Sequence, residues 1–188
     1  IFPNSLSKKE IKTEYIKVRK FIIGTDSFGR DVLGRIVLGT RVSLSIGFIA
    51  VIISLLIGLS LGMIGGYYGG FIDKVIMIII NIFWSIPTLL LVIAISIALG
   101  KGFWQVYIAV GLTMWVEVAR LVRGQVISEK NKDYIVATKV LGYSDLRIFI
   151  KHLLPNILGP ILIICAANFA SAILIESGLS FLGIGTQP

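Results

Sequence analysis

The side chains that could do acid–base or metal chemistry in this sequence are few and far apart. Glu176 lies near the end of one apolar run, and Glu117 lies inside another, shortly before Arg120. There is a single histidine, His152, and a single cysteine, Cys165. The sequence has no paired acids, no Cys/His cluster and no G-x-x-x-x-G-K-[ST] phosphate loop. It therefore predicts no catalytic residue, no metal site and no nucleotide-binding loop in this sequence.

Each of these residues also has a purely structural interpretation. His152 suits the C-terminal end of a helix, as a cap or a docking residue, better than it suits a role as ligand or base. Glu117 and Arg120 are spaced to form a local ion pair on a helix. Asp73, which lies at a turn between two apolar runs, would be an anchor at the membrane interface.

The surroundings of Glu176 leave three alternatives open. An ionisable group at the outer end of a span faces protein or water rather than lipid. That helical face could line a translocation pathway or contact a partner subunit, and simple external exposure of Glu176 is the third interpretation. At 100° per residue, four residues fall within roughly 140° of one face: Asn168, Ser171, Ala172 and Glu176.

The composition is that of an integral membrane protein. Apolar residues make up 56% of the 188 residues and charged residues only 15%. Several uncharged runs are longer than the roughly 18 residues that a transmembrane helix needs. The net charge of +8 is more typical of membrane topology and anionic lipid than of nucleic-acid binding, because no interleaving of aromatic and basic residues accompanies it.

The apolar runs predict four membrane spans within an all-α fold. They cover residues 42–65, 75–99, 103–118 or beyond, and 156–175. Pro87 lacks a backbone donor and should kink the second span. The sequence GGYYGG, which follows the first span, predicts a turn, since glycine tolerates positive φ.

Two basic segments, residues 1–41 and 120–151, are separated by three predicted spans and so lie on opposite faces of the membrane. The positive-inside rule counts residues close to a span, and most basic residues of the first segment lie far from one. We therefore expect residues 120–151 in the cytoplasm and residues 1–40 outside.

The charged insert between the third and fourth spans reads as a helix, a glycine turn and a second helix. Asp133 would cap the first helix, Gly142 would end it, and Ser144 would cap a second helix over residues 145–151. Pro155 suits the first turn of the next span. The insert keeps apolar residues outside the lipid, which suggests docking into a protein groove; the alternative is a hairpin packed only on its own subunit. These apolar residues are Ile135, Val136, Val140 and Leu141.

The insert resembles the E-A-A-x3-G-x9-I-x-L-P loop of bacterial ATP-binding-cassette importer permeases. The spacing is intact, although Val136 stands at the acidic position and Thr138 at the second alanine. His152 at the aliphatic position resembles the peptide and nickel branch of that family. Further blocks agree in order: GTDSFGRDVLGR, GGYYGGFIDK, ARLVRGQV, HLLPN and ESGLSFLGIGTQP. Together they resemble the C-type permease of dipeptide and oligopeptide importers.

The resemblance implies a helical bundle of six spans, one of them before Ile1 and one after Pro188, with residues 41–188 as the permease domain in the bacterial inner membrane. It implies a second permease subunit, two ATPase subunits that bind ATP and Mg, and an external substrate-binding protein, with no cofactor on this chain. It also implies that loop 124–155 couples to the ATPases. The residues that would do so are Tyr134, Val136, Ala137, Thr138, Leu141, Gly142, His152, Leu154 and Pro155.

Two matters remain open at this point. An ion-driven secondary transporter is a different class of function, but such proteins concentrate acids or bases in their spans, and the first two predicted spans contain none. The cargo could be a dipeptide, an oligopeptide, a nickel complex or another small solute.

Gly58 and Gly62, spaced i and i+4, suit close helix contact, which together with the resemblance predicts a heterodimer.

Overall fold

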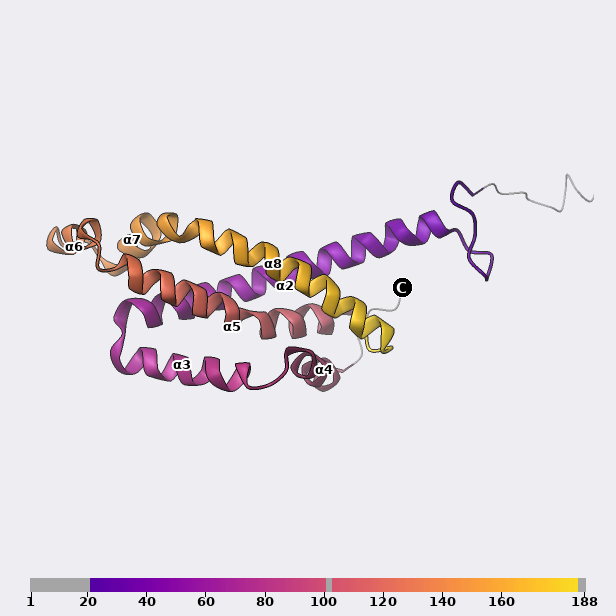
Figure 1. Cartoon of the computed structure of the whole chain (residues 1–188), viewed down its shortest axis with the longest axis horizontal. Helices are drawn as coiled ribbons and strands as arrows, with labels where there is room; N and C mark the ends of the chain where they lie inside the picture. Colours follow the sequence, from indigo (N-terminus) through magenta and orange to yellow (C-terminus); the bar gives the residue numbers. More distant parts are fainter. Residues whose placement is uncertain (1–20, 101–102, 186–188) are drawn as a thin grey trace, which may run out of the picture. The chain divides into compact units, whose positions relative to one another are not determined.

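The computed structural model describes residues 21–100 and 103–185, and Figure 1 shows their arrangement. In these residues every regular element is a helix, and the one β-bridge is an isolated antiparallel pair of Thr25 and Asp31, so the predicted all-α class is confirmed. The helices in order are α2 (Val32–Tyr68), α3 (Gly70–Trp84), α4 (Thr88–Ala98), α5 (Phe103–Glu129), α6 (Asp133–Val140), α7 (Asp145–Ile148), the π-helix η2 (Phe149–Leu153) and α8 (Leu154–Phe181).

Four apolar segments correspond to the four predicted spans. Three are single helices or helical runs long and apolar enough to cross a membrane: Val32–Tyr68, Trp104–Glu129 and Asp145–Phe181. The fourth is the pair α3 and α4, which are bent by 90° at their junction. The predicted kink at Pro87 is therefore a complete break. Pro87 adopts an extended conformation (φ −54°, ψ 126°), which ends the helical path before α4 begins.

The predicted bounds of the first span were wrong. Helix α2 begins at Val32 and runs through most of GGYYGG to Tyr68, so that only Gly69 lies between α2 and α3. Gly69 and Gly70 have φ of +68° and +56°. Helix α5 continues to Glu129, in agreement with a third span that extends beyond residue 118. The apolar stretch alone marks where a helix can lie in lipid, but not where its backbone hydrogen bonding stops.

A row of glycines on α2 brings this helix against α5. The glycine seam consists of Gly58, Gly62 and Gly66, one turn apart along α2. A Cβ on Gly58 would lie 2.6 Å from Cβ of Val118, and one on Gly66 would lie 2.9 Å from the carbonyl oxygen of Arg123. The predicted close helix contact is confirmed, but it lies within this chain. The seam therefore gives no support to a heterodimer, which stays a prediction.

The chain divides into two compact units, Ile1–Arg41 and Val42–Pro188. In the first unit, Asp26 organises the GTDSFGRD loop: its carboxylate accepts hydrogen bonds from the backbone N–H groups of Phe28 and Arg30 and pairs with the side chains of Arg30 and Arg35. The backbone N–H of Arg30, then that of Phe28, helps to lower the pKa of Asp26 to about 2. The loop is thus a self-capped turn. Residues 1–20 of the predicted external segment lie outside the described residues.

Candidate functional site

Gly142 makes the turn that the sequence predicted between two helices of the charged insert. The N–H of Gly142 donates to the carbonyl oxygen of Lys139 at 3.0 Å, and the N–H of Tyr143 donates to that of Thr138 at 3.1 Å. This pair of bonds is the Schellman arrangement that closes a helix, and it needs a left-handed residue at the position of Gly142. Its φ is +74°, as expected. The turn and its flanking helices, residues 130–155, are called the α6–α7 segment below.

The predicted cap of the first helix and the predicted end of the second were wrong. Asp133 is the first residue of α6 rather than its cap. Ser144 stands at the N-cap position of α7, which begins at Asp145 as predicted, but its side chain makes no capping bond. The second helix was predicted to end at Lys151, but α7 continues without a break through η2 into α8. His152 therefore lies inside a continuous helical run and caps nothing; its ring lies 5.9 Å from that of Tyr143. Pro155 lies in the first turn of α8, as predicted.

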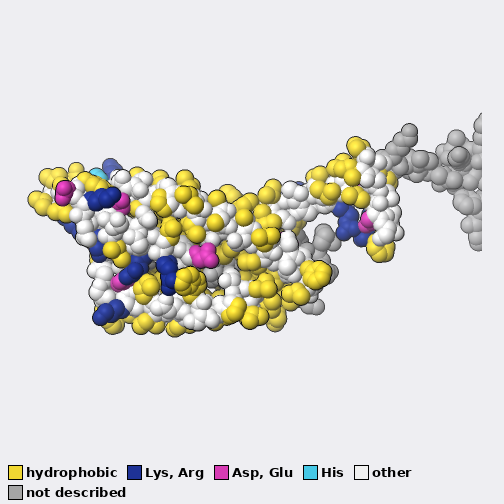
Figure 2. All heavy atoms as spheres, viewed as in Figure 1, with side chains coloured by type: hydrophobic (Ala, Val, Ile, Leu, Met, Phe, Trp, Pro, Cys, Tyr) yellow, Lys and Arg dark blue, Asp and Glu magenta, His cyan; other side chains and the backbone are white. Residues whose placement is uncertain are grey.

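One side of the α6–α7 segment is buried and the other is apolar and exposed. Ile135 was predicted to be on the docking surface, but it is fully buried in the core with Ile148 and Leu153. The exposed side forms what we call the apolar patch: Val136 (47% exposed), Val140 (82%), Leu141 (70%) and Leu146 (67%). In Figure 2 the hydrophobic atoms at the α6–α7 end lie on the open surface beside basic and acidic side chains.

The other predicted coupling residues support this surface from behind or beside it. The hydroxyl of Tyr134 donates to Glu129 at 2.6 Å, and burial, then this bond, raises the pKa of Tyr134 to about 12. Thr138 is buried and donates to the carbonyl oxygen of Ile135 at 2.7 Å. Ala137 is exposed, and Leu154 is half-buried against the core.

A group that sequence reasoning missed ties this segment to α2. The hydroxyls of Tyr67 and Tyr68 donate to the two carboxylate oxygens of Asp145 at 2.8 and 2.9 Å. The ring of Phe149 meets both tyrosine rings edge-on, with centroids 4.7 and 6.2 Å away. We call Tyr67, Tyr68, Asp145 and Phe149 the tyrosine clamp. Only the adjacent tyrosines in GGYYGG hinted at it, because its two halves are far apart in sequence.

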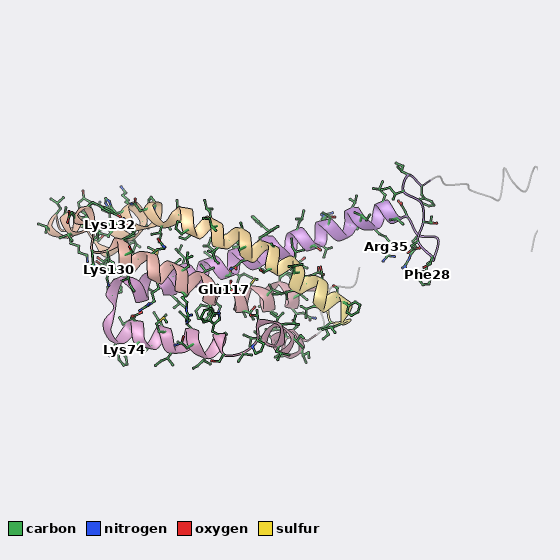
Figure 3. All side chains as sticks on the ribbon, in the orientation of Figure 1. Phe28, Arg35, Lys74, Glu117, Lys130 and Lys132 are labelled. Carbon is green, nitrogen blue, oxygen red and sulfur yellow. The ribbon has the colours of Figure 1, made fainter. Side chains whose placement is uncertain are left out.

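Lys130 makes a second link to the same end of α2. Its ammonium donates to the carbonyl oxygens of Gly66 at 2.7 Å and Tyr67 at 3.3 Å, in the last turn of that helix. A cation there satisfies carbonyl groups that the helix leaves unpaired. Lys132, close to it in Figure 3, pairs with Glu129 at 2.7 Å. The charged residues around the end of α5 thus hold the segment against the bundle.

Asp73 does more than anchor an interface. It forms a two-bond ion pair with Arg123, and the Nη2–Oδ2 distance is 2.6 Å. The pair joins the start of α3 to α5 across the same end of the bundle. The sequence did not predict this pair, because it does not reveal that α3 and α5 are neighbours here.

The four residues predicted to lie on one face of the last span are all on α8, but they differ in burial. Asn168, Ala172 and Glu176 are buried within this chain, whereas Ser171 is exposed. Glu176 is 6% exposed and accepts hydrogen bonds from Ser43 at 3.2 Å and Ser180 at 2.8 Å. Simple external exposure of Glu176 is therefore wrong; pathway and partner contact remain predictions.

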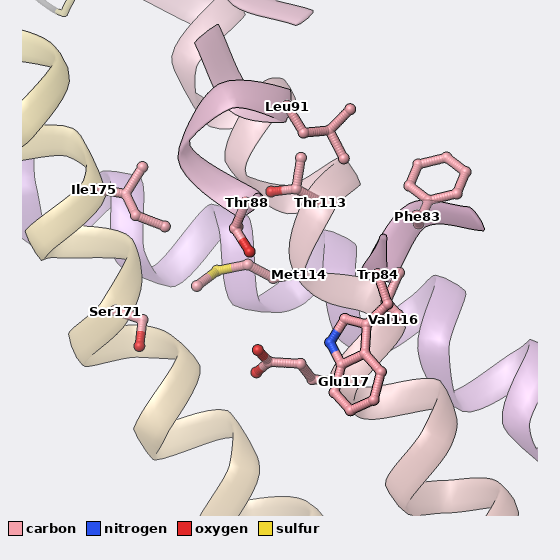
Figure 4. A pocket seen from close by; sticks show the side chains of 10 residues that line it. All are labelled: Phe83, Trp84, Thr88, Leu91, Thr113, Met114, Val116, Glu117, Ser171 and Ile175. Atoms are coloured by element: carbon pink, nitrogen blue, oxygen red, sulfur yellow. The ribbon is translucent and has the colours of Figure 1, made fainter. Parts of the chain in front are cut away.

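The predicted ion pair between Glu117 and Arg120 is absent from the part of the chain that the structure describes. Arg120 turns toward α3, donates to Asn81 at 2.9 Å and lies 3.5 Å from the ring centre of Trp84. Glu117 instead lines a cavity of about 210 Å³ together with Ser171. Figure 4 shows its carboxylate directed into the space between α5 and α8.

Comparison with known proteins agrees with this architecture. The protein-family model "Binding-protein-dependent transport system inner membrane component" matches residues 54–188. The oligopeptide transport system permease protein OppC of Bacillus subtilis is 42% identical over 162 residues, which cover 86% of this chain and 53% of that protein. The dipeptide transport system permease protein DppC of the same organism is 44% identical (87% and 51% covered), and OppC of Salmonella typhimurium is 48% identical (87% and 54%). The chain spans about half the length of these curated relatives.

Proposed function

We propose, from the premise that this chain belongs to the family of binding-protein-dependent transport system inner membrane components, that it forms half of the membrane pathway of an ATP-driven importer of dipeptides or oligopeptides. The apolar patch is the observation that carries the mechanism. Four large exposed apolar side chains on α6, its C-cap and α7 are costly in water, and they suit a partner's groove.

The partner that suits the patch is an ATPase subunit. This sequence has no phosphate-binding loop of its own, so ATP and Mg would be bound and used by other chains. Two such subunits that close on nucleotide would push on the α6–α7 segment of each permease, as in other transitions driven by rigid-body closure. The chain itself would bind no cofactor and would perform no chemistry.

The contacts of the segment give such a push a path into the membrane. The tyrosine clamp and Lys130 fasten the segment to the last turn of α2. The glycine seam then presses α2 against α5 so closely that neither can slide without moving the other. Movement at the patch would thus reach α5, which lines the cavity.

The remaining partners follow from the family and from the names of its relatives. A second permease would complete the pathway in the bacterial inner membrane, and an external binding protein would deliver the peptide. With the α6–α7 segment in the cytoplasm, residues 1–40 would lie outside, since three predicted spans separate the two segments in the sequence. The relatives are named for oligopeptides and dipeptides, and we assign the same class of cargo to this chain.

Purification of the full-length protein with everything bound to it tests the proposal. We expect a second permease and an ATPase to co-purify, and the complex in vesicles to take up a radiolabelled peptide only with ATP and the external binding protein. The test variant is Leu141→Asp, which puts one negative charge into the patch at an exposed position. The control is Asn131→Asp, which adds the same charge at an exposed position outside the patch. An active transporter without any ATPase would contradict the proposal.

A further inference from the structure

The cavity beside Glu117 has the features of a binding site that the proposed mechanism does not yet use. It lies where the break between α3 and α4 meets α5 and α8 (Figure 4). Its polar lining comes from Thr88, Thr113, Glu117 and Ser171, and its apolar lining includes Trp84 and Met114. Its volume of about 210 Å³ is far more than the roughly 10–15 Å³ that one water requires.

Glu117 lies within Trp104–Glu129, one of the helices long and apolar enough to cross a membrane. It stands near the middle of α5 (Phe103–Glu129), about 20 Å from either end at 1.5 Å per residue. A carboxylate at that depth is expensive to expose to lipid, so it faces water, a ligand or another protein group. A charged group in such a place is most often functional rather than structural.

The cations near Glu117 are engaged elsewhere. Arg120, one turn further along α5, is held on α3 by Asn81 and by the face of Trp84. Arg123, the next basic residue of α5, is paired with Asp73. In the described residues no ion pair involves Glu117, whereas Arg120 and Arg123 both interact with side chains of α3. The carboxylate therefore remains available to a cation that enters the cavity.

The broken span opens onto the same space. Trp84 ends α3 and Thr88 begins α4, and both line the cavity, so the non-helical residues between them lie beside it. Irregular backbone at membrane depth is tolerated where it borders protein or a hydrated cavity. The Pro87 break and the position of Glu117 thus point independently to a hydrated, solute-accessible space.

The groups around the cavity suit an ammonium ion. An ammonium group has three donors, and a carboxylate with nearby hydroxyl oxygens supplies strong acceptors for them. A metal ion is poorly matched, because no group of three or more His, Cys, Asp or Glu side chains is placed to hold one among the described residues. Met114 and Ile175 offer an apolar wall for the carbon atoms next to the charged nitrogen.

From these observations we infer that the Glu117 cavity binds the free amino-terminal ammonium group of the peptide during its passage through the membrane. This inference rests on the proposed function, since it assigns a role to one residue of that pathway. The carboxylate of Glu117 would accept a hydrogen bond from the ammonium group, and the hydroxyl oxygens of Ser171 and Thr88 would accept further ones. The first side chain of the peptide would lie against Met114.

Uptake by the complete transporter, carrying Glu117→Gln, tests the inference. The peptides are one sequence with a free amino terminus and the same sequence N-acetylated, chosen so that the external binding protein delivers both. We expect Glu117→Gln to lower uptake of the free peptide about tenfold, the effect of losing one hydrogen bond to a charged group, and to leave the acetylated peptide unchanged. Glu117→Asp should restore most of the preference. Ser177→Ala, an exposed hydroxyl on α8 bonded only to its own helix, is the control.

Three results would overturn the inference. An equal loss for both peptides would mean that Glu117 supports the fold or the transport cycle in general. No loss for either would mean that the cavity is not used. A lower yield of the assembled complex would mean that Glu117 meets a basic residue of the partner permease. Wild-type complex that takes up neither peptide would instead refute the proposed function, and this is measured first.

Discussion

Gly62 and Gly142 lie in two regions of the molecule that require glycine for different reasons. In the glycine seam, a Cβ on Gly62 would lie 2.6 Å from the carbonyl oxygen of Ala119 and 2.8 Å from Cβ of Val122. In the α6–α7 segment, a Cβ on Gly142 would meet nothing within 4 Å, but its φ is +74°. The seam excludes a side chain because there is no room, whereas the turn excludes one because of its backbone conformation.

The two regions therefore differ in rigidity and in exposure. The seam joins α2 and α5 by backbone contact, so these helices form a rigid unit that repacks only as a whole. In the α6–α7 segment most residues are exposed. A few buried apolar side chains and a small number of polar contacts fasten it to the bundle. Movement of the exposed α6–α7 segment can therefore be transmitted to α2 and α5 together. Substitutions in the glycine seam should lower stability, whereas substitutions in the α6–α7 segment should lower transport.

The largest effect is expected for Gly62→Val. The added carbons meet a backbone carbonyl, which cannot rotate aside, so α2 and α5 must separate along the seam. Overpacking costs about 1–3 kcal/mol or more, and we expect little folded protein by size-exclusion chromatography and a lower melting temperature. Gly124→Val is the matched control, because Gly124 lies on α5 with nothing within 4 Å. Equal losses for both variants would show that the seam is not special.

Gly142→Val should leave the fold intact and damage transport. Valine at a φ of +74° is strained by about 1–3 kcal/mol, which would shift the apolar patch without affecting the spans. We expect normal membrane insertion, strongly reduced ATP-driven uptake, and either weaker ATPase association or ATP hydrolysis unlinked to uptake. Gly142→Asn, which tolerates the left-handed region better, should keep most of the activity. Normal uptake and ATPase binding in the valine variant would exclude the segment as the coupling element.

The sequence predicted the features that follow from local chemistry. The apolar runs gave the number of spans, and Gly142, followed by polar residues, gave the turn with positive φ. It failed where distant segments meet. Neither the pairing of Asp73 with Arg123 nor that of Tyr67 with Asp145 has a local signature, since the partners lie on different helices. The prediction of a Glu117–Arg120 ion pair was wrong for the same reason: Arg120 instead donates a hydrogen bond to Asn81 on α3.

Asp145→Ala should give an intermediate effect, since it removes one fastening and leaves the other. The two tyrosine hydroxyls lose their acceptor, while the ring contacts of Phe149 and the bonds of Lys130 remain. We expect amide hydrogens of residues 145–153 to exchange about tenfold faster, a loss of about 1.4 kcal/mol of local stability. Uptake should fall less than in Gly142→Val. Tyr143→Phe is the control, because in the described structure the Tyr143 hydroxyl makes no hydrogen bond that holds the segment to α2. Equal amide exchange rates in Asp145→Ala and Tyr143→Phe would contradict the role of the tyrosine clamp.

The smallest effect concerns Tyr134, at the corner between α5 and α6. Burial, then its bond to Glu129, raises the pKa of Tyr134 to about 12 from 10.0, so the folded protein favours the protonated phenol. Because the folded pKa is the higher one, this stabilisation is complete below about pH 10 and disappears as the pH rises through about 12. The carbon-13 shift of a labelled tyrosine, assigned by its loss in Tyr134→Phe, should therefore titrate with a midpoint well above the ordinary value of 10.0. Glu129→Gln should move this titration toward the ordinary value, only part of the way, because burial remains. A midpoint near 10 in the unmodified protein would mean that Tyr134 faces water and that the corner is not held by Glu129.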